Sequence, residues 1–305
     1  MECRINGLLK SNKVPNRIED SIIQQSSNPL FHPPAIADIT CTDSGNTRMS
    51  QKTHLSAFVS EIFSSAQGEG VNIGRRQLFV RFCECHRNCL YCDTPVERTD
   101  AVSIEREPGS GRFESVPNPL SAKQLLKLLA DMNCPESAHD DLFITGGEPL
   151  LQADFLAAFL PEARKQLNLP VHLETSGDLP EPFAKVTEWI DHVLMDIKLP
   201  SVTGEPEAWE MHRAFLDSIE REEIGATIKL VVSADTSDSD LARAAEIIRM
   251  SGSLAAVVLQ PMTAASKTDR VPTAKQVLTW QSQMAVALGR SVRVIPQCHK
   301  MMGLL

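Results

Sequence analysis

Apolar and polar positions follow two alternating patterns along the chain from residue 57 onward. Short runs of β-forming residues, mostly bounded by Gly, Pro or Ser, predict strands. These runs lie at 57–63, 77–82, 141–147, 170–177, 192–198, 226–233, 255–261 and 291–297. Between many of them, apolar residues recur at helical spacing and predict helices at 121–132, 152–167, 239–250 and 274–288. Strands that alternate with helices predict an α/β fold with βαβ units and a parallel sheet.

Two segments depart from this pattern. Residues 1–56 are rich in Ser, Asn, Thr and Pro and show weak periodicity, so we expect a mostly disordered N-terminal extension. Residues 95–120 are polar and contain REPGSGRFESVPNP, so we expect a surface loop there. The folded domain predicted from these patterns therefore comprises residues 57–305.

The bulk composition excludes some classes of protein. The apolar fraction of 42% is enough for an ordinary buried core. The net charge is −9 and the chain has no long run of Lys or Arg, which disfavours a nucleic-acid partner. No segment has about 18 consecutive apolar residues, so no membrane span is predicted. The N-terminus lacks the apolar core of a secretory signal, and we therefore expect a cytoplasmic protein whose thiols stay reduced.

Polar residues follow directly after several of the predicted strands. The strand ends read ITGGEP, LETSG, MDIK and LQP. In parallel α/β sheets and barrels, binding sites are built at the carboxyl ends of the strands. Four such endings therefore predict one pocket above one sheet.

The chain places four of its eight cysteines between Cys83 and Cys92. Three of them, Cys85, Cys89 and Cys92, follow the spacing C-x3-C-x2-C in CHRNCLYC. Three thiolates at this spacing can ligate a [4Fe-4S] cluster through three of its four irons. The open iron can hold S-adenosylmethionine, whose reductive cleavage gives a 5′-deoxyadenosyl radical. The alternative is a structural zinc site with Cys83 or His86 as the fourth ligand.

The sequence around these cysteines, EIFSSAQGEGVNIGRRQLFVRF followed by CECHRNCLYCDT, resembles the opening of the 7-carboxy-7-deazaguanine synthases of the radical S-adenosylmethionine (SAM) superfamily. The resemblance continues through ITGGEPLLQ, LETSG, DIK, LQP and IPQCHK, and it covers residues 57–305. It implies a radical SAM catalytic domain folded as a modified, incomplete (β/α) TIM-like barrel.

This resemblance also implies an activity. The substrate would be 6-carboxy-5,6,7,8-tetrahydropterin, which a carbon–nitrogen lyase of this family converts to 7-carboxy-7-deazaguanine with loss of ammonia, on the way to queuosine and other 7-deazapurines. The implied cofactors are a [4Fe-4S] cluster, S-adenosylmethionine and Mg²⁺. The implied partners are a reductant such as flavodoxin or ferredoxin and a second copy of the chain in a homodimer.

Roles for individual residues are implied in the same way. The cluster would be held by Cys85, Cys89 and Cys92, and the magnesium ion by the hydroxyl of Thr94. Contacts to S-adenosylmethionine are implied for Tyr91, Cys92, Asp93, Gly147, Glu148, Ser176, Asp196, Lys198 and Gln260. Contacts to the pterin are implied for Ala66, Gln67, Gly68, Glu69, Arg81, Thr145, His299 and Leu305.

The chemistry of several side chains agrees with these roles. The guanidinium of Arg81 can pair bidentately with a carboxylate. The amide of Gln67 and the carboxylate of Glu69 can match the donors and acceptors of a pterin edge, and an oxygen such as that of Thr94 suits Mg²⁺. The structural alternatives are a salt-bridged arginine at a strand end and a solvated turn in the glycine-flanked loop.

Two positions depart from the pattern of the family. Glu84 stands before the first cluster cysteine, where Gly is common, and Tyr91 stands where Trp is common. The main rival function is an activase of a glycyl-radical enzyme, which would share C-x3-C-x2-C and GGEP. An activase would not need QGEG, Arg81 and the PQCHK tail to form a pterin pocket. A zinc-bound structural module is the rival from a different class.

Overall fold

The computed structural model describes residues 55–134, 138–252, 255–264 and 270–305. Nearly all of the segment 1–56 lies outside the described residues, so the predicted extension and the domain start at residue 57 stay predictions.

The secondary structure alternates between strands and helices. The strands are β1 (Ser56–Ala57), β2 (Val59–Ala66), β3 (Arg76–Phe82), β4 (Ala101–Ile104), β5 (Glu114–Pro117), β6 (Leu120–Ser121), β7 (Asp141–Gly146), β8 (Val171–Thr175), β9 (His192–Asp196), β10 (Gly225–Val232), β11 (Ala256–Pro261) and β12 (Arg293–Val294). The α-helices are α1 (Ala122–Met132), α2 (Ala153–Leu167), α3 (Pro180–Ala184), α4 (Pro200–Thr203), α5 (Trp209–Arg221), α6 (Asp238–Met250), α7 (Ala274–Leu288) and α8 (Cys298–Met302). Short 3-10 helices are η1 (Gly70–Asn72), η2 (Pro149–Gln152) and η3 (Thr187–Trp189).

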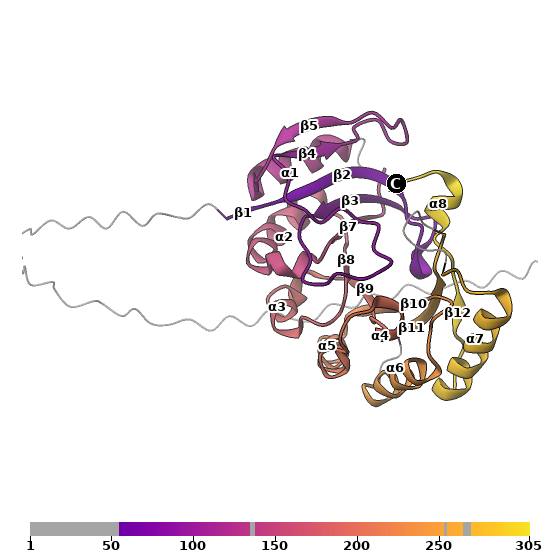
Figure 1. Cartoon of the computed structure of the whole chain (residues 1–305). Helices are drawn as coiled ribbons and strands as arrows, with labels where there is room; N and C mark the ends of the chain where they lie inside the picture. Colours follow the sequence, from indigo (N-terminus) through magenta and orange to yellow (C-terminus); the bar gives the residue numbers. More distant parts are fainter. Residues whose placement is uncertain (1–54, 135–137, 253–254, 265–269) are drawn as a thin grey trace, which may run out of the picture. The chain divides into compact units, whose positions relative to one another are not determined.

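One large sheet organises the domain. Its strand order is β12-β11-β10-β9-β8-β7-β3-β2-β4-β5. Neighbouring strands from β12 to β3 are parallel, whereas β2 is antiparallel to β3. The sheet curves, with α2, α5, α6 and α7 along its outer side (Figure 1). Because the two edge strands β12 and β5 do not pair within the described residues, the sheet stays open, as expected for an incomplete barrel.

The largest differences from the sequence-based prediction concern the segment 95–120 and the helix α5. The segment 95–120 was expected to be a surface loop, but it contains β4 and β5, which extend the sheet as an antiparallel pair. Val102 and Ile104 of β4 are fully buried, and a four-residue strand is too short for its alternation to stand out in a polar segment. The helix α5 was also not predicted, although Trp209, Phe215 and Ile219 form a buried stripe along it.

Residue parity along each strand decides which side chains face the site. In β3, Leu78, Val80 and Phe82 point outward and pack with helix residues in the main core. The intervening Phe79 and Arg81 face inward and line a cavity. The same alternation turns Thr145, Glu174, Asp196, Lys229 and Gln260 of five other strands toward that cavity. The sheet therefore has an apolar outer face, whereas its inner face carries polar residues where the cavity lies.

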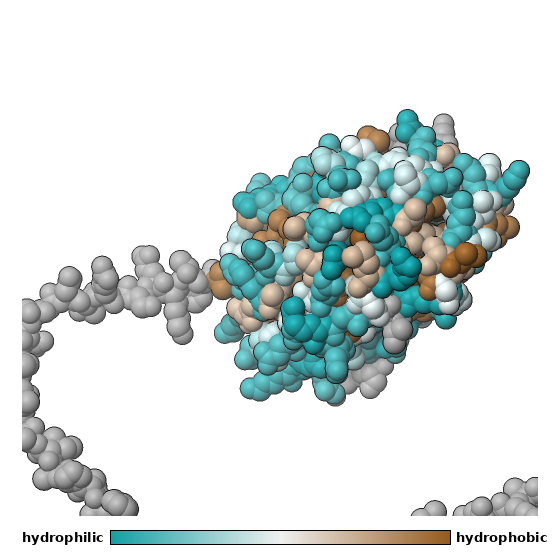
Figure 2. Space-filling view, turned by 90° about the horizontal axis from the view of Figure 1, so that it is seen from below, coloured by the Kyte–Doolittle hydropathy of each residue, from teal (hydrophilic) through white to brown (hydrophobic). Residues whose placement is uncertain are grey.

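An apolar layer lies on the inner face of the sheet. Phe63, Phe79, Phe143 and Leu194 form a separate buried cluster there. The rings of Phe63 and Phe79 are stacked, with centroids 4.8 Å apart. The face of the domain in Figure 2 is mostly hydrophilic, with apolar side chains scattered over it. Among the helices that the structure describes, none has the length and apolar character needed to cross a membrane.

Candidate active site

A cavity of about 220 Å³ lies at the carboxyl ends of the parallel strands. Apart from Glu148, every predicted site residue lines it. These are Ala66, Gln67, Gly68, Glu69, Arg81, Cys85, Cys89, Tyr91, Cys92, Asp93, Thr94, Thr145, Gly147, Ser176, Asp196, Lys198, Gln260, His299 and Leu305. The fold thus brings residues from both ends of the domain into one space.

The loop after β3 carries the three spaced cysteines into this cavity. Cys85, Cys89 and Cys92 are partly buried free thiols, and the amide of Cys92 donates to the carbonyl of Cys89 over 3.0 Å. Burial raises the pKa of Cys85, and it raises the pKa of Cys89 to about 11. Without a bound cation these thiols stay protonated, whereas a coordinated metal would deprotonate them. Three thiols on one cavity wall fit a cluster that uses one thiolate per iron.

The geometry does not support the zinc alternative. Cys83 is fully buried and lies outside the cavity lining. His86 contacts Asp178, with Nε2 3.0 Å from the nearer carboxylate oxygen. In the part of the chain that the structure describes, no three His, Cys, Asp or Glu side chains converge on a point where a single ion could bind. A structural zinc site needs four such ligands around one ion.

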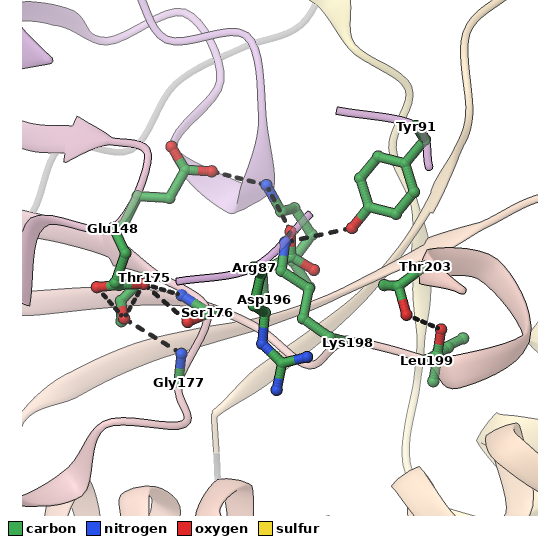
Figure 3. A network of polar contacts seen from close by, with 12 residues as sticks. Arg87, Tyr91, Glu148, Thr175, Ser176, Gly177, Asp196, Lys198, Leu199 and Thr203 are labelled. Carbon is green, nitrogen blue, oxygen red and sulfur yellow. Dashed lines mark hydrogen bonds and ion pairs between the residues drawn. The ribbon is translucent and has the colours of Figure 1, made fainter. Parts of the chain in front are cut away.

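The GGEP turn packs directly against the cysteine loop. A Cβ at Gly147 would come within 2.1 Å of the carbonyl oxygen of Glu84, so only glycine fits at this contact. Glu148 follows, and its buried carboxylate accepts bonds from the Thr175 hydroxyl and from the amide and hydroxyl of Ser176 (Figure 3). Burial raises the pKa of Glu148. Glu148 thus holds the end of β8 against the turn instead of lining the cavity.

Glu84 connects the turn to the cysteine loop through its backbone. Its amide donates to the carbonyl of Val96 over 2.7 Å, and its carbonyl accepts from the amide of Glu148 over 2.8 Å. Its φ is 71°, in the left-handed region that favours glycine. The carboxylate pairs with Arg98 at 2.9 Å, and that guanidinium lies 4.6 Å from the ring centre of Phe58. The backbone shape therefore explains why glycine suits this position and how glutamate is accommodated.

We expect Glu84→Gly to change the free energy of unfolding by less than about 1 kcal/mol, because relief of backbone strain is offset by the flexibility of glycine and the lost Arg98 pair. Glu84→Ile should destabilise by about 2 kcal/mol, because a β-branched residue tolerates a left-handed φ poorly. Urea unfolding measures both. Glu223→Ile, at φ 54° and outside the cavity lining, is the control for strain without contact to the site. Equal stability of wild type and Glu84→Ile would contradict the expectation.

The ends of β8 and β9 form the second wall. Lys198 donates to Asp196 over 2.7 Å and to the hydroxyl of Tyr91 over 3.2 Å (Figure 3). Within the described residues, Asp196 Oδ1 and Gln260 Oε1 are buried acceptors without a hydrogen-bond donor, and both residues line the cavity. Unsatisfied buried acceptors indicate a missing partner. S-adenosylmethionine carries an ammonium, an amine and hydroxyls, so these residues fit it.

His212 of α5 ties the two strand-end loops together from behind. It is fully buried, with Nδ1 2.9 Å from the carbonyl oxygen of Gly177 and Nε2 3.3 Å from the amide of Lys198. These partners require Nδ1 to donate and Nε2 to accept, which is the neutral tautomer. Burial lowers the pKa of His212 to about 4.

Acid should therefore lower the free energy of unfolding, because His212 becomes protonated when the protein unfolds. Between its unfolded pKa of about 6.5 and its folded pKa of about 4, the unfolded state binds a proton that the folded state does not. The contribution of His212 to the free energy of unfolding is therefore complete above about pH 6.5. Below that pH, the free energy of unfolding falls by up to about 1.4 kcal/mol per pH unit. His212→Leu should cost about 2 kcal/mol at neutral pH and less at about pH 5. Urea unfolding at several pH values tests this; a difference independent of pH would contradict it.

The AQGEG loop and the C-terminal helix form the third wall. Gln67 is buried, and its amide donates to Gln77 over 2.9 Å while its carbonyl accepts from the amide of Glu69. The carbonyl of Gly68 accepts from the amide of Cys298 at the start of α8 over 2.9 Å. A Cβ on Gly68 would lie 2.3 Å from Nδ1 of His299. The glycine therefore allows α8 to dock on the loop.

Arg81 and Thr94 also line the cavity, Arg81 beside Glu61 and Phe63, and Thr94 next to Asp93. Arg81 Nε donates to Glu61 over 2.9 Å, and its guanidinium lies 5.6 Å from the ring centre of Phe63. Next to Thr94, Asp93 pairs with Lys300 of α8 over 2.5 Å. The cysteine loop is thus also joined to the C-terminal helix.

Sequence reasoning missed four charged residues of the cavity, namely Arg87, Glu174, Lys229 and Lys300. Lys229 lies within the apolar run of β10, whose pattern predicts a strand and no functional residue. Glu174 lies at the end of β8, within LETSG. Alternation along the strands is the signal that could have found Lys229 and Glu174, because both residues occupy positions that face the cavity.

Comparisons with known proteins agree with this arrangement. The model of the radical SAM superfamily matches residues 80–248, which is more than half of the chain. A 7-carboxy-7-deazaguanine synthase from Geobacter sulfurreducens is 39% identical over 251 residues, covering 82% of this chain and 98% of that protein. One from Thermococcus kodakarensis is 30% identical over 259 residues, covering 81% of this chain and 98% of that protein.

A solved structure supports the fold. The crystal structure of QueE from Escherichia coli superposes with a TM-score of 0.51 at 20% identity, covering 81% of this chain and 96% of that chain. The predicted α/β fold of the radical SAM type, with an open and mostly parallel sheet, is therefore confirmed. From the superfamily match and the relatives that align along almost their whole length, the chain belongs to the 7-carboxy-7-deazaguanine synthase family of the radical SAM superfamily.

Proposed function

We propose that this protein is a radical SAM lyase that converts 6-carboxy-5,6,7,8-tetrahydropterin to 7-carboxy-7-deazaguanine with loss of ammonia. One observation carries the proposal: the three-cysteine loop and the wall formed by the AQGEG loop, Arg81 and His299 line the same cavity. A cluster-bearing loop alone would suit many radical SAM enzymes. The added wall supplies the charges and hydrogen-bonding groups that a carboxylated pterin needs.

The cofactors supply the radical chemistry, and the chain supplies binding and orientation. When bound, the cluster and S-adenosylmethionine would provide the radical that abstracts hydrogen from the substrate. Cys85, Cys89 and Cys92 would hold the cluster. Asp196 and Gln260 would accept from S-adenosylmethionine through the acceptors that lack donors. The apolar wall around Phe63, Phe79 and Phe143 would keep water from the reacting atoms.

Substrate orientation would come from the charged wall. Arg81 donates from Nε to Glu61, and its terminal nitrogens would pair with the substrate carboxylate. Glu69 and His299 would face the polar edge of the pterin, with Gln67 holding the loop through its buried amide. Leu305 lines the cavity and would close it together with α8.

Four further features belong to this proposal. Thr94 would bind Mg²⁺ through its hydroxyl, together with substrate oxygens and waters. The protein would act as a homodimer, and a flavodoxin or ferredoxin would deliver the electron. The free cysteines among the described residues suit a reducing compartment such as the cytoplasm. Light scattering of the purified protein and turnover with and without Mg²⁺ test the first two.

Anaerobic turnover tests the function itself. Reconstituted protein, reductant, S-adenosylmethionine, Mg²⁺ and 6-carboxytetrahydropterin are combined, and the products are identified by mass spectrometry. We expect 7-carboxy-7-deazaguanine and ammonia. Cleavage of S-adenosylmethionine with an intact pterin would overturn the substrate assignment but not the superfamily. The activase alternative is not favoured, because the two relatives described above, which align with this chain over 98% of their own length, are named 7-carboxy-7-deazaguanine synthases.

A further inference from the structure

A buried lysine stands between the carboxylates of the cavity. Lys229 lies in β10, in register with Asp196 of β9, and is 4% exposed. Its ammonium lies 2.6 Å from Glu69 Oε2, 2.7 Å from Glu174 Oε1 and 3.5 Å from Asp196 Oδ2. The three carboxylates come from the AQGEG loop, β8 and β9. One cation thus bridges the side of the cavity assigned to the pterin and the side assigned to S-adenosylmethionine.

The hydrogen-bond partners of Glu69 and Glu174 show how many acceptor positions the two carboxylates keep for a ligand. The other oxygen of Glu69 accepts from Gln297 over 2.9 Å. The other oxygen of Glu174 accepts from the Thr145 hydroxyl over 2.9 Å. A carboxylate has about four acceptor positions, so each glutamate keeps room for further donors. Both residues line the cavity, and a ligand that offers N–H groups at two points would match them.

We propose that Lys229 is a positioning residue, which fixes the carboxylates of Glu69 and Glu174 as a pair of acceptors and thereby selects a substrate that presents N–H donors along one edge. This inference rests on the proposed function, since a tetrahydropterin has such an edge. Lys229 does not itself need to touch the substrate. Its ammonium occupies one acceptor position of each glutamate, Gln297 and Thr145 occupy another, and the positions that remain would accept from the ligand.

The electrostatics of the cluster agree with this role. Burial by itself would raise the pKa of Glu69, but attraction and hydrogen bonding from Lys229 outweigh burial and lower it to about 2. Burial would lower the pKa of Lys229, but Glu174 and Glu69 raise it well above its ordinary value. The other charged or titratable groups that face this cluster are Asp196, Lys198 and His299. Without the cation, the carboxylates of Glu69, Glu174 and Asp196 would face one another, and the pKa of Glu69 would rise.

Lys229→Met tests the inference, because Met has a similar length and no charge. We expect the pKa of Glu69 to rise, which a pH titration of the infrared carboxyl bands reads without any ligand, with Glu69→Gln used to assign the band. The pterin Kd should rise about 10- to 100-fold, the worth of a hydrogen bond to a charged group. The acid limb of kcat/KM should move to higher pH, and iron content should stay unchanged. Lys229→Arg keeps the charge and should keep the acid limb in place.

Two controls separate this role from plain stability. Lys185→Met removes a half-exposed lysine paired with Asp154 and should leave the titration, the Kd and the iron content unchanged. If Lys229→Met does not fold, the same comparison is made in the Glu174→Gln background, where one fewer carboxylate faces the site. If Lys229→Met leaves the pKa of Glu69 unchanged, in the wild-type protein or in the Glu174→Gln variant, the inference is overturned. Wild-type protein that fails to convert the pterin overturns the proposed function, and the infrared result then still decides the role of Lys229.

Discussion

Cys89→Ala is expected to abolish turnover of the pterin and cleavage of S-adenosylmethionine together. Cys89 is the middle residue of the three-cysteine loop, and its thiol lines the cavity with those of Cys85 and Cys92. A cluster bound through three thiolates would lose one ligand and the open iron that binds S-adenosylmethionine. Iron analysis and visible absorbance after anaerobic reconstitution measure this loss independently of activity.

Cys134→Ala is the matched control for Cys89→Ala. Cys134 is an exposed free thiol just after α1 and lies outside the cavity lining. Its replacement should leave iron content, colour and turnover at the level of wild type. If Cys89→Ala kept full iron and full activity, the three-cysteine site would be wrong. If Cys134→Ala lost iron as well, the assay would be reporting general damage to thiols.

Gly68→Ala should lower kcat/KM for the pterin by about 100-fold while the cluster stays intact. The new Cβ would lie 2.3 Å from Nδ1 of His299 and 2.5 Å from its backbone nitrogen, so α8 has to move away from the AQGEG loop. A displacement of about 1 Å at a positioning group can cost this much. The bond between Gln297 and Glu69 should weaken with it. Steady-state kinetics give kcat/KM, and cleavage of S-adenosylmethionine without substrate reports the cofactor half.

Gly225→Ala is the control for the effect of an added methyl group. Gly225 lies at the start of β10, and its new Cβ would come no closer than 3.1 Å to any neighbour. It should keep kcat/KM within about threefold of wild type. An unchanged kcat/KM in Gly68→Ala would show that α8 does not need to dock on the loop for turnover. Loss of iron in Gly68→Ala would instead mean that the loop supports the cluster.

Much of the fold follows from patterns that lie within a few residues of one another. The period of two in the strands and the helical spacing of Leu125 and Leu129 depend on local geometry. The capping box at the start of α1 is also local, because it joins Ser121 to Gln124, three residues further on. The prediction for the segment 95–120 failed because β4 is stabilised by pairing with β2, which is far away in the sequence, and β5 pairs in turn with β4. Strands of four residues carry too little pattern of their own to be identified.

In the candidate site, too, some features depend on neighbouring residues and others depend on segments far apart in the sequence. The spacing of Cys85, Cys89 and Cys92 lies within one loop, so the sequence by itself determined which thiols come together. The sequence also indicated that polar strand ends would meet, because parallel strands share one carboxyl edge.

Only the tertiary structure decided which charged groups of the site contact one another. It turned the carboxylate of Glu148 away from the cavity and onto Ser176, and it placed Lys229 between Glu69 and Glu174. These residues are separated by up to 160 positions in the chain. Electrostatic contacts depend on distances of a few ångströms and on burial, and both are set only when the sheet has curved and its strands have packed side by side.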